Sequence, residues 1–433
     1  MPVRHDVVPA PNILSPGRSI KPQVLLVAPY YAPSCYGGAV QLYHQMLIRL
    51  QALKAVVVTQ RQDRGDVRVL EQFDRSCPRQ NGYEVRRIQR FELAFAPSAT
   101  LASRLVEAGQ FFVRTSREWR AVLCAVRPDV VICGATYIAG WLMGQVPGAI
   151  PLINYLHGEE LAAASASRFL RPLLFRAQMR AMRRAAVNIA VSRYTADRAA
   201  ELAGIARDRI VILPNFVDTE RFSPPPDKEK LRRELGWQGK RIILSLARLT
   251  PRKGIDQAIR AIAQLKRAGR LPADWVHIIA GAGEQERELR ALAEQTGANA
   301  YTRFEGFIPE AKVPSYLGAA DIFLQPNRDI AGNTEGFGIV FIEASACGTP
   351  VIGGVAGGTA DAIYEGITGF RVNAEDLSSI SHAIDVLIHS DQLRRDMGVA
   401  GIEIVRRNFG VGPAVRRFEA VVLGVLDQQR RPH

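Results

Sequence analysis

The sequence predicts an α/β protein of two doubly wound, Rossmann-like domains with a cleft between them. Apolar, β-branched runs alternate with stretches of helical period along the chain, which is the pattern of βαβ units and parallel sheets. A Pro-rich stretch at 222–230, FSPPPDKEK, interrupts the alternation and has the composition of a linker. The 433 residues also exceed what one hydrophobic core usually serves.

The predicted strands are 23–30, 55–60, 130–134, 151–158, 187–192 and 209–215 before the linker, and 241–248, 275–281, 301–307, 321–327 and 349–354 after it. Helices are predicted between them, for instance over 254–268 and 284–296. Another is predicted from about Gly338 to Gly348, because glycine commonly ends a helix and the Thr-Pro that follows stops it. Ligands of open parallel sheets bind at the carboxyl ends of strands, so residues that follow strands are the candidate site residues.

Composition narrows the class of protein. We divide the chain into a loose, Pro-rich leader over 1–20, a first domain over 21–214 and a second domain over 215–411. The leader lacks the apolar core of a secretory signal, and no run of about 18 apolar residues predicts a membrane-spanning helix. Five cysteines without CxxC spacing argue against a disulfide framework or a zinc site and suit a reducing cytoplasm.

The net charge of +14 reflects either arginine-rich usage or an anionic partner. The candidate partners are nucleic acid, an acidic membrane surface and phosphorylated small molecules, and composition does not choose among them.

Two candidate sites follow strands of the first domain. Gly37 and Gly38 stand between the strand 23–30 and a helical stretch, where paired glycines let the backbone approach an anion. A tight βα turn explains them equally well, and the GxGxxG dinucleotide fingerprint is missing. His157 stands at the end of the strand 151–158 and precedes a glycine, which favours a functional histidine over a structural one.

The second domain contributes cations. Arg248 and Lys253 follow the strand 241–248. An arginine fork beside a lysine point charge suits a diphosphate, although both side chains could equally be solvated.

The stretch EGFGIVFIE adds two carboxylates beside a helix that apolar residues surround. Glu335 is predicted in the turn before the helix and Glu343 inside it, and a buried carboxylate needs hydroxyl or amide partners. The helix N-terminus, flanked by Gly336 and Gly338, presents N–H groups and positive potential toward the cleft. An anionic ligand rich in hydroxyl groups, such as a nucleotide sugar, satisfies both features.

The stretch EGFGIVFIEASACGTPVIG (335–353) resembles the E-x7-E signature of the retaining nucleotide-sugar glycosyltransferases of family four, which have the GT-B fold. Other motifs match that family in order and spacing: SRYTAD (192–197), PNFVD (214–218), ARLTPRKG (247–254), GAGEQ (281–285), GFIPE (306–310), AADIFLQPN (319–327) and GGTADAIYEGITGF (357–370). The resemblance covers roughly residues 22–425. It implies that a final helix over about 412–430 crosses back onto the first domain.

The resemblance implies a role for each candidate residue. Arg248 and Lys253 are expected to neutralise the donor diphosphate, and Glu343 to hold the ribose hydroxyls. Glu335 is expected to face the donor sugar. The residues expected to act in catalysis or donor binding beside these are Gly37, Gly38, His157, Gly336, Phe337 and Gly338. Family members need neither metal nor other cofactor, because cations can stabilise the leaving diphosphate.

The expected activity is retaining transfer of a hexosyl residue from a nucleoside-diphosphate sugar to a lipid-linked or glycan acceptor, in polysaccharide or glycolipid synthesis. The loop NRDIAGNT (327–334) is longer than is common in the family and is similar to that of phosphatidylinositol mannosyltransferases, which favours GDP-mannose. The alternatives are a GT-B enzyme without transfer, such as a sugar-nucleotide epimerase, and transfer to a small soluble acceptor. PNFVD departs from the family by a phenylalanine where glycine is usual, which concerns the hinge.

The segment 166–186 carries six arginines among Leu, Phe and Met, a composition that suits a helix lying on anionic lipid. A surface helix packed on the first domain explains it as well. Nucleic acid is not an expected partner, because no aromatic-interleaved basic platform is present. The expected location is the cytoplasm, and lipid binding by the segment 166–186 would place the protein peripherally on the inner face of the membrane.

Overall fold

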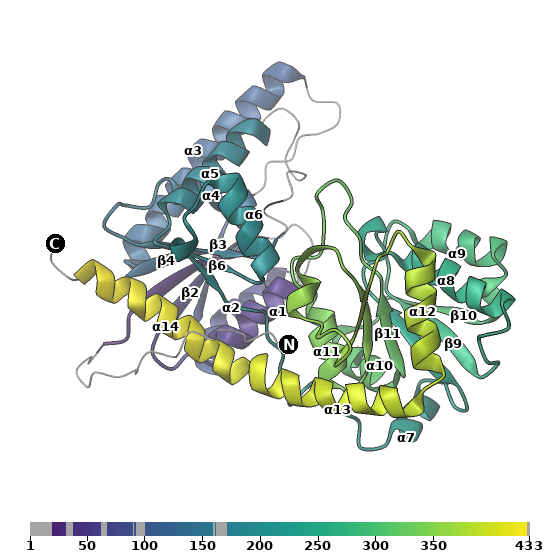
Figure 1. Ribbon diagram of the computed structural model, residues 1–433. Helices are drawn as coiled ribbons and strands as arrows, with labels where there is room; N and C mark the ends of the chain where they lie inside the picture. Colours follow the sequence, from purple (N-terminus) through teal and green to yellow (C-terminus); the bar gives the residue numbers. More distant parts are fainter. Residues whose placement is uncertain are drawn as a thin grey trace.

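The computed structural model describes residues 20–31, 38–61, 67–89, 91, 100–158, 161 and 171–430. Two α/β domains stand side by side, each built around its own twisted sheet (Figure 1). The predicted two-domain, doubly wound fold is therefore confirmed. The predicted leader lies almost entirely outside the described residues.

The first domain holds a seven-stranded sheet in the order β3-β2-β1-β4-β5-β6-β7, in which all neighbouring strands are parallel. Its strands are β1 (Gln23–Val27), β2 (Lys54–Gln60), β3 (Glu84–Ile88), β4 (Val130–Cys133), β5 (Leu152–Leu156), β6 (Val187–Ala190) and β7 (Ile210–Ile212). Its helices are α1 (Gly38–Leu47), α2 (Val67–Asn81), α3 (Leu101–Val126), α4 (Thr136–Met143), α5 (Arg171–Arg184) and α6 (Arg193–Ala203).

Both faces of this sheet are covered. Val24 and Leu26 of β1 belong to one hydrophobic cluster, whereas Leu25 and Val27 belong to another, because successive side chains of a strand point to opposite faces. Strands buried on both faces read as continuous apolar runs. This is why QVLLV and its counterparts can be recognised in the sequence.

The second domain holds a six-stranded parallel sheet in the order β10-β9-β8-β11-β12-β13. Its strands are β8 (Arg241–Leu246), β9 (Trp275–Ala280), β10 (Thr302–Gly306), β11 (Ile322–Gln325), β12 (Val351–Gly354) and β13 (Gly369–Val372). Its helices are α7 (Lys228–Glu234), α8 (Ile255–Arg267), α9 (Glu286–Gln295), α10 (Val313–Ala319), α11 (Ile339–Ala346), α12 (Leu377–Ile388) and α13 (Asp391–Asn408), and α14 (Val411–Arg430) follows.

Helix α14 ties the end of the chain to the first domain. Figure 1 shows α13 along the second domain and α14 running on beneath the first, in the yellow part of the chain. The carboxylate of Glu419 on α14 is buried and accepts the backbone N–H groups of Gln51 and Ala52 at 2.7 and 2.6 Å. These two N–H groups lie just beyond α1, so the Glu419 contact joins the last helix to the first domain.

Every predicted strand is present in the structure, but the strands β3 and β13 were not predicted. Both lie at the edge of a sheet. The sequence of β3, EVRRI, alternates charged and apolar residues and is only partly buried, and β13, GFRV, has four residues. Edge strands lack the continuous apolar run that marks a central strand, so the apolar pattern did not reveal them. Within the described residues, no helix is both long and apolar enough to span a bilayer.

Candidate active site

The two domains touch where strands β5 and β11 lead into loops. Residues His157 and Gly158 follow β5, and Gly336 lies in the segment between β11 and α11. A Cβ at Gly158 would lie 2.9 Å from the Cα of Gly336, and a Cβ at Gly336 would overlap the carbonyl oxygen of His157. Glycine is therefore required at this backbone-to-backbone approach. It brings the sequence-predicted histidine close to the segment that carries Glu335.

Glu335 lies at the centre of a buried ion cluster. Its Oε2 accepts from Lys253 Nζ at 2.6 Å and from Arg252 Nη1 at 2.8 Å. The Glu335 side chain is 15% exposed. Burial alone would raise the pKa of Glu335, but the charges of Lys253 and Arg252 override burial and hold that pKa below its ordinary value. Glu335 is therefore an ionised acceptor flanked by two cations.

The loop that carries these cations is fixed from both sides. Gly254 has a φ of +68°, and a Cβ there would overlap the carbonyl oxygen of Pro326, which follows β11. Arg328 Nε donates to the carbonyl oxygen of Pro251 at 3.1 Å, and Arg328 Nη2 contacts both carboxylate oxygens of Asp256 at 3.1 Å. The turn after β8 is thus clamped to the segment after β11. This clamp places Lys253 against Glu335.

His157 is held by two tyrosines. Its Nε2 lies 2.6 Å from the Tyr43 hydroxyl, and its ring stacks on Tyr155 at 4.9 Å between ring centroids. The Tyr43 hydroxyl donates its single proton to the carbonyl oxygen of Gly134 at 2.9 Å. With that proton on the Gly134 carbonyl, the hydroxyl accepts from His157, which assigns the imidazole proton to Nε2. Burial lowers the pKa of His157 to about 4, so the ring is neutral near pH 7.

Glu343 differs electrostatically from Glu335. Burial, together with the nearby Glu310 carboxylate, raises the pKa of Glu343 to about 8, against the lowering effect of Arg221. Arg221 Nη2 donates to Glu310 Oε1 at 2.9 Å, so its charge is already shared with another acid. Glu343 is therefore largely protonated near pH 7 in the ligand-free protein. No pattern in the sequence indicates that the two glutamates ionise so differently.

The other predicted residues do not all contact the cluster around Glu335. Arg248 follows β8 and is exposed, and within the described part of the chain no ion pair or hydrogen bond joins its side chain to Lys253 or Glu335. The Phe337 side chain is 1% exposed and packs against Phe409, which leaves only its backbone to face a ligand. Arg252 was missed by the sequence reasoning. Its signal was its place directly before Lys253, where it adds a second cation.

Helix N-termini from both domains meet at the site. Gly38 is the first residue of α1, and a Cβ on it would lie 3.2 Å from Ile339 Cδ1, at the start of α11. Gly338 is the N-cap residue of α11 and has no side chain of its own to cap that N-terminus. Helix N-termini carry positive potential, so this point of contact suits an anion. Gly37 lies outside the described residues.

The first domain also holds the Glu335 segment through a second set of contacts. Ser192 and Thr195 hydroxyls donate to the carbonyl oxygen of Gly336 at 2.7 and 3.3 Å. The backbone N–H and Nε of Arg193 donate to Asp361 Oδ2 and Oδ1, each at 2.6 Å. Sequence reasoning noted these stretches only as family motifs. Their joint role depends on a contact between domains that no local pattern reveals.

Comparison with known proteins finds family models that match each of the two domains. The family model described as "Glycosyltransferase Family 4" matches residues 36–221, and that described as "Glycosyl transferases group 1" matches residues 227–403. One curated relative is the GDP-mannose-dependent alpha-(1-6)-phosphatidylinositol monomannoside mannosyltransferase of Mycolicibacterium smegmatis. It is 31% identical over 335 residues, which cover 76% of this chain and 81% of the relative. A 2-deoxystreptamine glucosyltransferase of Streptomyces kanamyceticus is 29% identical over 274 residues, 61% of this chain and 66% of the relative.

Solved structures support the same fold. Anabaena HepE, crystallised in complex with UDP, superposes with a TM-score of 0.70 at 20% identity and covers 93% of this chain and 100% of its own. Sucrose-phosphate synthase from Thermosynechococcus elongatus superposes with a TM-score of 0.73 at 20% identity and covers 94% of this chain and 100% of its own. The family models, the curated relative and these folds lead to one conclusion: the chain belongs to the family-four glycosyltransferases of GT-B fold.

Proposed function

We propose that this chain is a retaining mannosyltransferase that moves mannose from GDP-mannose to a lipid-linked glycan acceptor, without a metal ion or other cofactor. The observation that carries the proposal is the cluster of Arg252, Lys253 and Glu335 beside two helix N-termini. The names of the mannosyltransferase relatives, which are GDP-mannose-dependent and act on phosphatidylinositol mannosides, support the choice of donor and acceptor.

The cations supply the charge that a diphosphate leaving group needs. A lysine ammonium has three donors and an arginine guanidinium has five, so Lys253 and Arg252 can bind phosphate oxygens while each keeps one bond to Glu335. Arg248 is exposed and carries no acid partner in the described part of the chain, so it can turn to the same diphosphate. Fixed positive charge of this kind stabilises a departing diphosphate as a metal ion does in other transferases.

The proposed transfer proceeds on one face of the sugar. The bond between the mannose anomeric carbon and the GDP oxygen breaks, and the acceptor hydroxyl oxygen forms the new bond from the same side. The hydroxyl proton passes to the departing diphosphate oxygen, which gives GDP and a glycoside of retained configuration. Glu335 would accept hydroxyls of the sugar. Neutral His157, whose Nε2–H is directed to Tyr43, would contact the sugar through the rest of its ring.

We also propose that the protein lies in the cytoplasm and binds the inner face of the membrane. On α5, the last-turn residues Arg183 and Arg184 donate to the backbone carbonyls of Ala203 and Met143, so these two arginines secure the helix to the domain. Arg176, Arg180 and Leu173 on the same helix are exposed. An apolar side chain beside two cations suits an anionic lipid surface. The part of the segment over 166–170 lies outside the described residues.

The test combines binding with product analysis. Thermal unfolding is followed with GDP, UDP, ADP and their sugar conjugates, since a ligand of the folded state raises the transition temperature by mass action. GDP-mannose is then incubated with phosphatidylinositol monomannoside vesicles, with and without EDTA, and the product's anomeric configuration is read by NMR. Release of GDP in proportion to an α-linked product, unaffected by EDTA, supports the proposal. Conversion of the donor in the absence of acceptor would instead indicate an epimerase.

A further inference from the structure

A buried tyrosine links the edge strand β3 to helix α1. Tyr83 directly precedes β3, and its side chain belongs to the same hydrophobic cluster as Tyr43 of α1. Its hydroxyl lies 3.0 Å from the Tyr31 hydroxyl and 2.7 Å from His44 Nδ1. Tyr31 follows β1, and His44 lies on α1. One hydroxyl group therefore joins the end of β1, the helix α1 and the start of β3.

The three rings hold this hydroxyl in place. The Tyr83 ring meets the rings of Tyr31 and His44 edge to face, with 6.1 Å between the ring centroids of each pair. Edge-to-face contact is a favoured geometry of aromatic pairs. Burial and the charge of Arg49 lower the pKa of His44, so its imidazole is neutral near pH 7 and Nδ1 can accept the proton of the Tyr83 hydroxyl. The contact therefore restrains the orientation of the His44 side chain.

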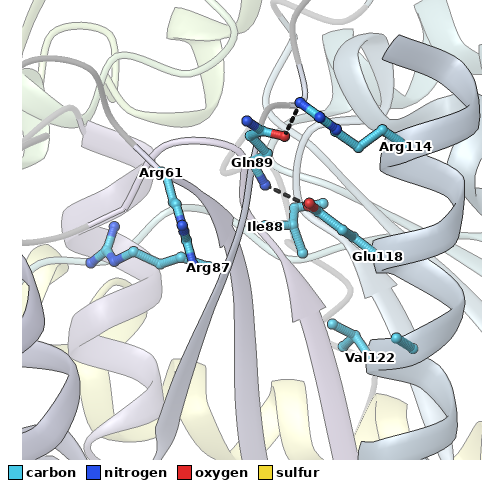
Figure 2. Close-up of a pocket in the computed structure, with 8 residues that line it drawn as sticks. Arg61, Arg87, Ile88, Gln89, Arg114, Glu118 and Val122 are labelled. Carbon is cyan, nitrogen blue, oxygen red and sulfur yellow. Dashed lines mark hydrogen bonds between the residues drawn. The ribbon is translucent and has the colours of Figure 1, made fainter. Parts of the chain in front are cut away.

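Strand β3 is a firm base for this contact, because helices hold it on both faces of the sheet. The Arg87 guanidinium contacts both carboxylate oxygens of Asp74 on α2 at 2.7 and 2.9 Å. On the other face, Glu118 of α3 accepts the backbone N–H of Gln89 at 2.7 Å, and Arg114 of α3 donates to the Gln89 side chain at 2.9 Å. Figure 2 shows these last two bonds as dashed lines, with Arg87 at the left of the view. The residue that precedes β3 is thus fixed relative to the sheet.

Helix α1 connects this contact with the candidate active site. Tyr43 directly precedes His44 in the sequence. The Tyr43 hydroxyl contacts His157 Nε2 at 2.6 Å and the carbonyl oxygen of Gly134 at 2.9 Å. In the sheet, β3 lies on one side of β1, whereas β4 and β5, which Gly134 and His157 follow, lie on the other side. Because successive residues of a helix point ~100° apart, Tyr43 and His44 hold α1 from two sides, and a rotation of α1 that frees one contact moves the other.

The same helix also meets the second domain at its N-terminus. A Cβ on Gly38, the first residue of α1, would lie 3.2 Å from Ile339 Cδ1 at the start of α11. At 1.5 Å of rise per residue, Gly38 and His44 are only about 9 Å apart along the helix axis. A displacement of α1 at His44 is therefore transmitted both to the Tyr43 contact with His157 and to the contact of α1 with α11.

We propose that Tyr83 and His44 form a positioning pair for the transfer reaction: their contact fixes the rotation of α1 and thereby holds Tyr43 against His157. This inference rests on the proposed transfer, in which His157 contacts the donor sugar. The pair acts through Tyr43 and not on the substrate itself. Neither residue lies in the motifs by which the chain resembles its family, so the pair was visible only once β3 and α1 were placed beside each other.

The test is a set of substitutions with a matched control. Tyr83→Phe keeps the buried ring and removes the hydroxyl, so kcat should fall about tenfold while KM for GDP-mannose changes by less than about twofold. His44→Leu should have the same effect. In His44→Asn the side-chain amide takes the place of Nδ1 and can still contact Tyr83, so kcat should lie closer to that of the wild type. The control Tyr316→Phe removes the hydroxyl of another buried tyrosine, which donates to Glu305 at 3.3 Å on the second domain, and should leave kcat unchanged.

Coupling to Tyr43 separates positioning from a general loss of packing. If Tyr83 acts through Tyr43, adding Tyr83→Phe to Tyr43→Phe should lower kcat by less than about twofold further, because the contact that Tyr83 maintains is already lost. Two substitutions that act independently would instead multiply their effects, and that result would overturn the proposal.

A second measurement needs no transfer. ¹⁵N NMR of the ligand-free protein should show a changed His157 ring signal in Tyr83→Phe and an unchanged signal in Tyr316→Phe, with urea unfolding as the check that each variant is folded. A His157 signal that is the same in Tyr83→Phe as in the wild type would rule out the positioning pair. If the wild type transfers nothing from GDP-mannose, the proposed function fails, while the His157 signal still decides whether Tyr83 positions this ring.

Discussion

Lys253 Nζ lies 2.6 Å from Glu335 Oε2, although 82 positions of sequence separate the two residues. The contact joins the turn after β8 to the segment before α11, and Arg252 reaches the same oxygen at 2.8 Å. All three side chains are less than one-fifth exposed. A buried carboxylate with two cations keeps one net positive charge at the site. That excess charge is what a diphosphate would neutralise.

Lys253→Met is expected to lower kcat/KM for mannosyl transfer by about 10²-fold or more, because a fixed charge on the leaving group is lost. Arg252 still pairs with Glu335 in this variant, so the fold should persist. Initial rates with GDP-mannose and acceptor vesicles measure the change. The matched control is Lys230→Met, which removes an exposed lysine on α7. Wild-type turnover in the Lys253 variant would contradict the assignment of this cation.

Glu343→Gln tests the contrast between the two glutamates. If the ribose hydroxyls donate to Glu343, donor binding requires the carboxylate, whose pKa is raised to about 8 in the free protein. Affinity for GDP-mannose should therefore rise roughly tenfold or more between about pH 6 and pH 8 and level off above that. His157, with a pKa of about 4, and Glu335, with a lowered pKa, do not titrate in this window. In Glu343→Gln this rise in affinity with pH should vanish. Calorimetric titration of GDP-mannose at several pH values measures it. A rise that persists in the variant would refute the binding of the ribose hydroxyls by Glu343.

The raised pKa of Glu343 has a second consequence, for stability. The folded protein holds the proton more tightly than the unfolded chain, whose ordinary value is 4.5. The ligand-free wild type therefore loses stability, relative to Glu343→Gln, as pH rises from about 4.5 to about 8. Urea unfolding of both proteins at a series of pH values measures this difference. A difference that is constant with pH would mean that Glu343 titrates normally.

The sequence predicts the fold and the position of the site better than it predicts the contacts and the ionisation of the site's residues. Apolar runs identify the central strands, and the rule that ligands bind after strands selects His157, Lys253 and Glu335. Local patterns do not identify which cation meets Glu335, because Arg248 and Arg252 are equally plausible until β11 is packed beside β8. They also cannot show that Glu343 lies near Glu310, and that tertiary contact makes its ionisation unlike that of Glu335.

Tyr43→Phe is expected to disturb the histidine while leaving the core filled. Tyr43 is 2% exposed, and phenylalanine fills the same space, but the hydroxyl between His157 Nε2 and the carbonyl oxygen of Gly134 is lost. His157 Nε2 then loses this hydroxyl partner, and kcat should fall about tenfold with little change in donor KM. ¹⁵N NMR of the His157 ring should show a mixture of tautomers. A single Nε2–H tautomer in the variant would rule out this positioning role.

Asp361→Asn should impair the enzyme more than Arg193→Ala, although both remove the same ion pair. The Arg193 side chain is 50% exposed, so its ion pair with Asp361 contributes little by itself. The Asp361 carboxylate is 10% exposed and also accepts the backbone N–H at the start of α6, where a negative charge favours the helix N-terminus. That contact crosses from the second domain to the first and lies near the Ser192 bond to the Gly336 carbonyl that holds the Glu335 segment.

The Asp361→Asn variant is therefore expected to lower kcat about tenfold and to raise the radius of gyration of the GDP-bound protein, measured by small-angle X-ray scattering. Arg193→Ala should change kcat by less than about twofold and leave the radius of gyration unchanged, because the backbone N–H remains available to Asp361. Asp396→Asn, an exposed acid on α13, serves as the control for loss of charge alone. Equal effects of the Asp361 and Arg193 substitutions would show that the exposed ion pair, rather than the carboxylate at the start of α6, joins the two domains.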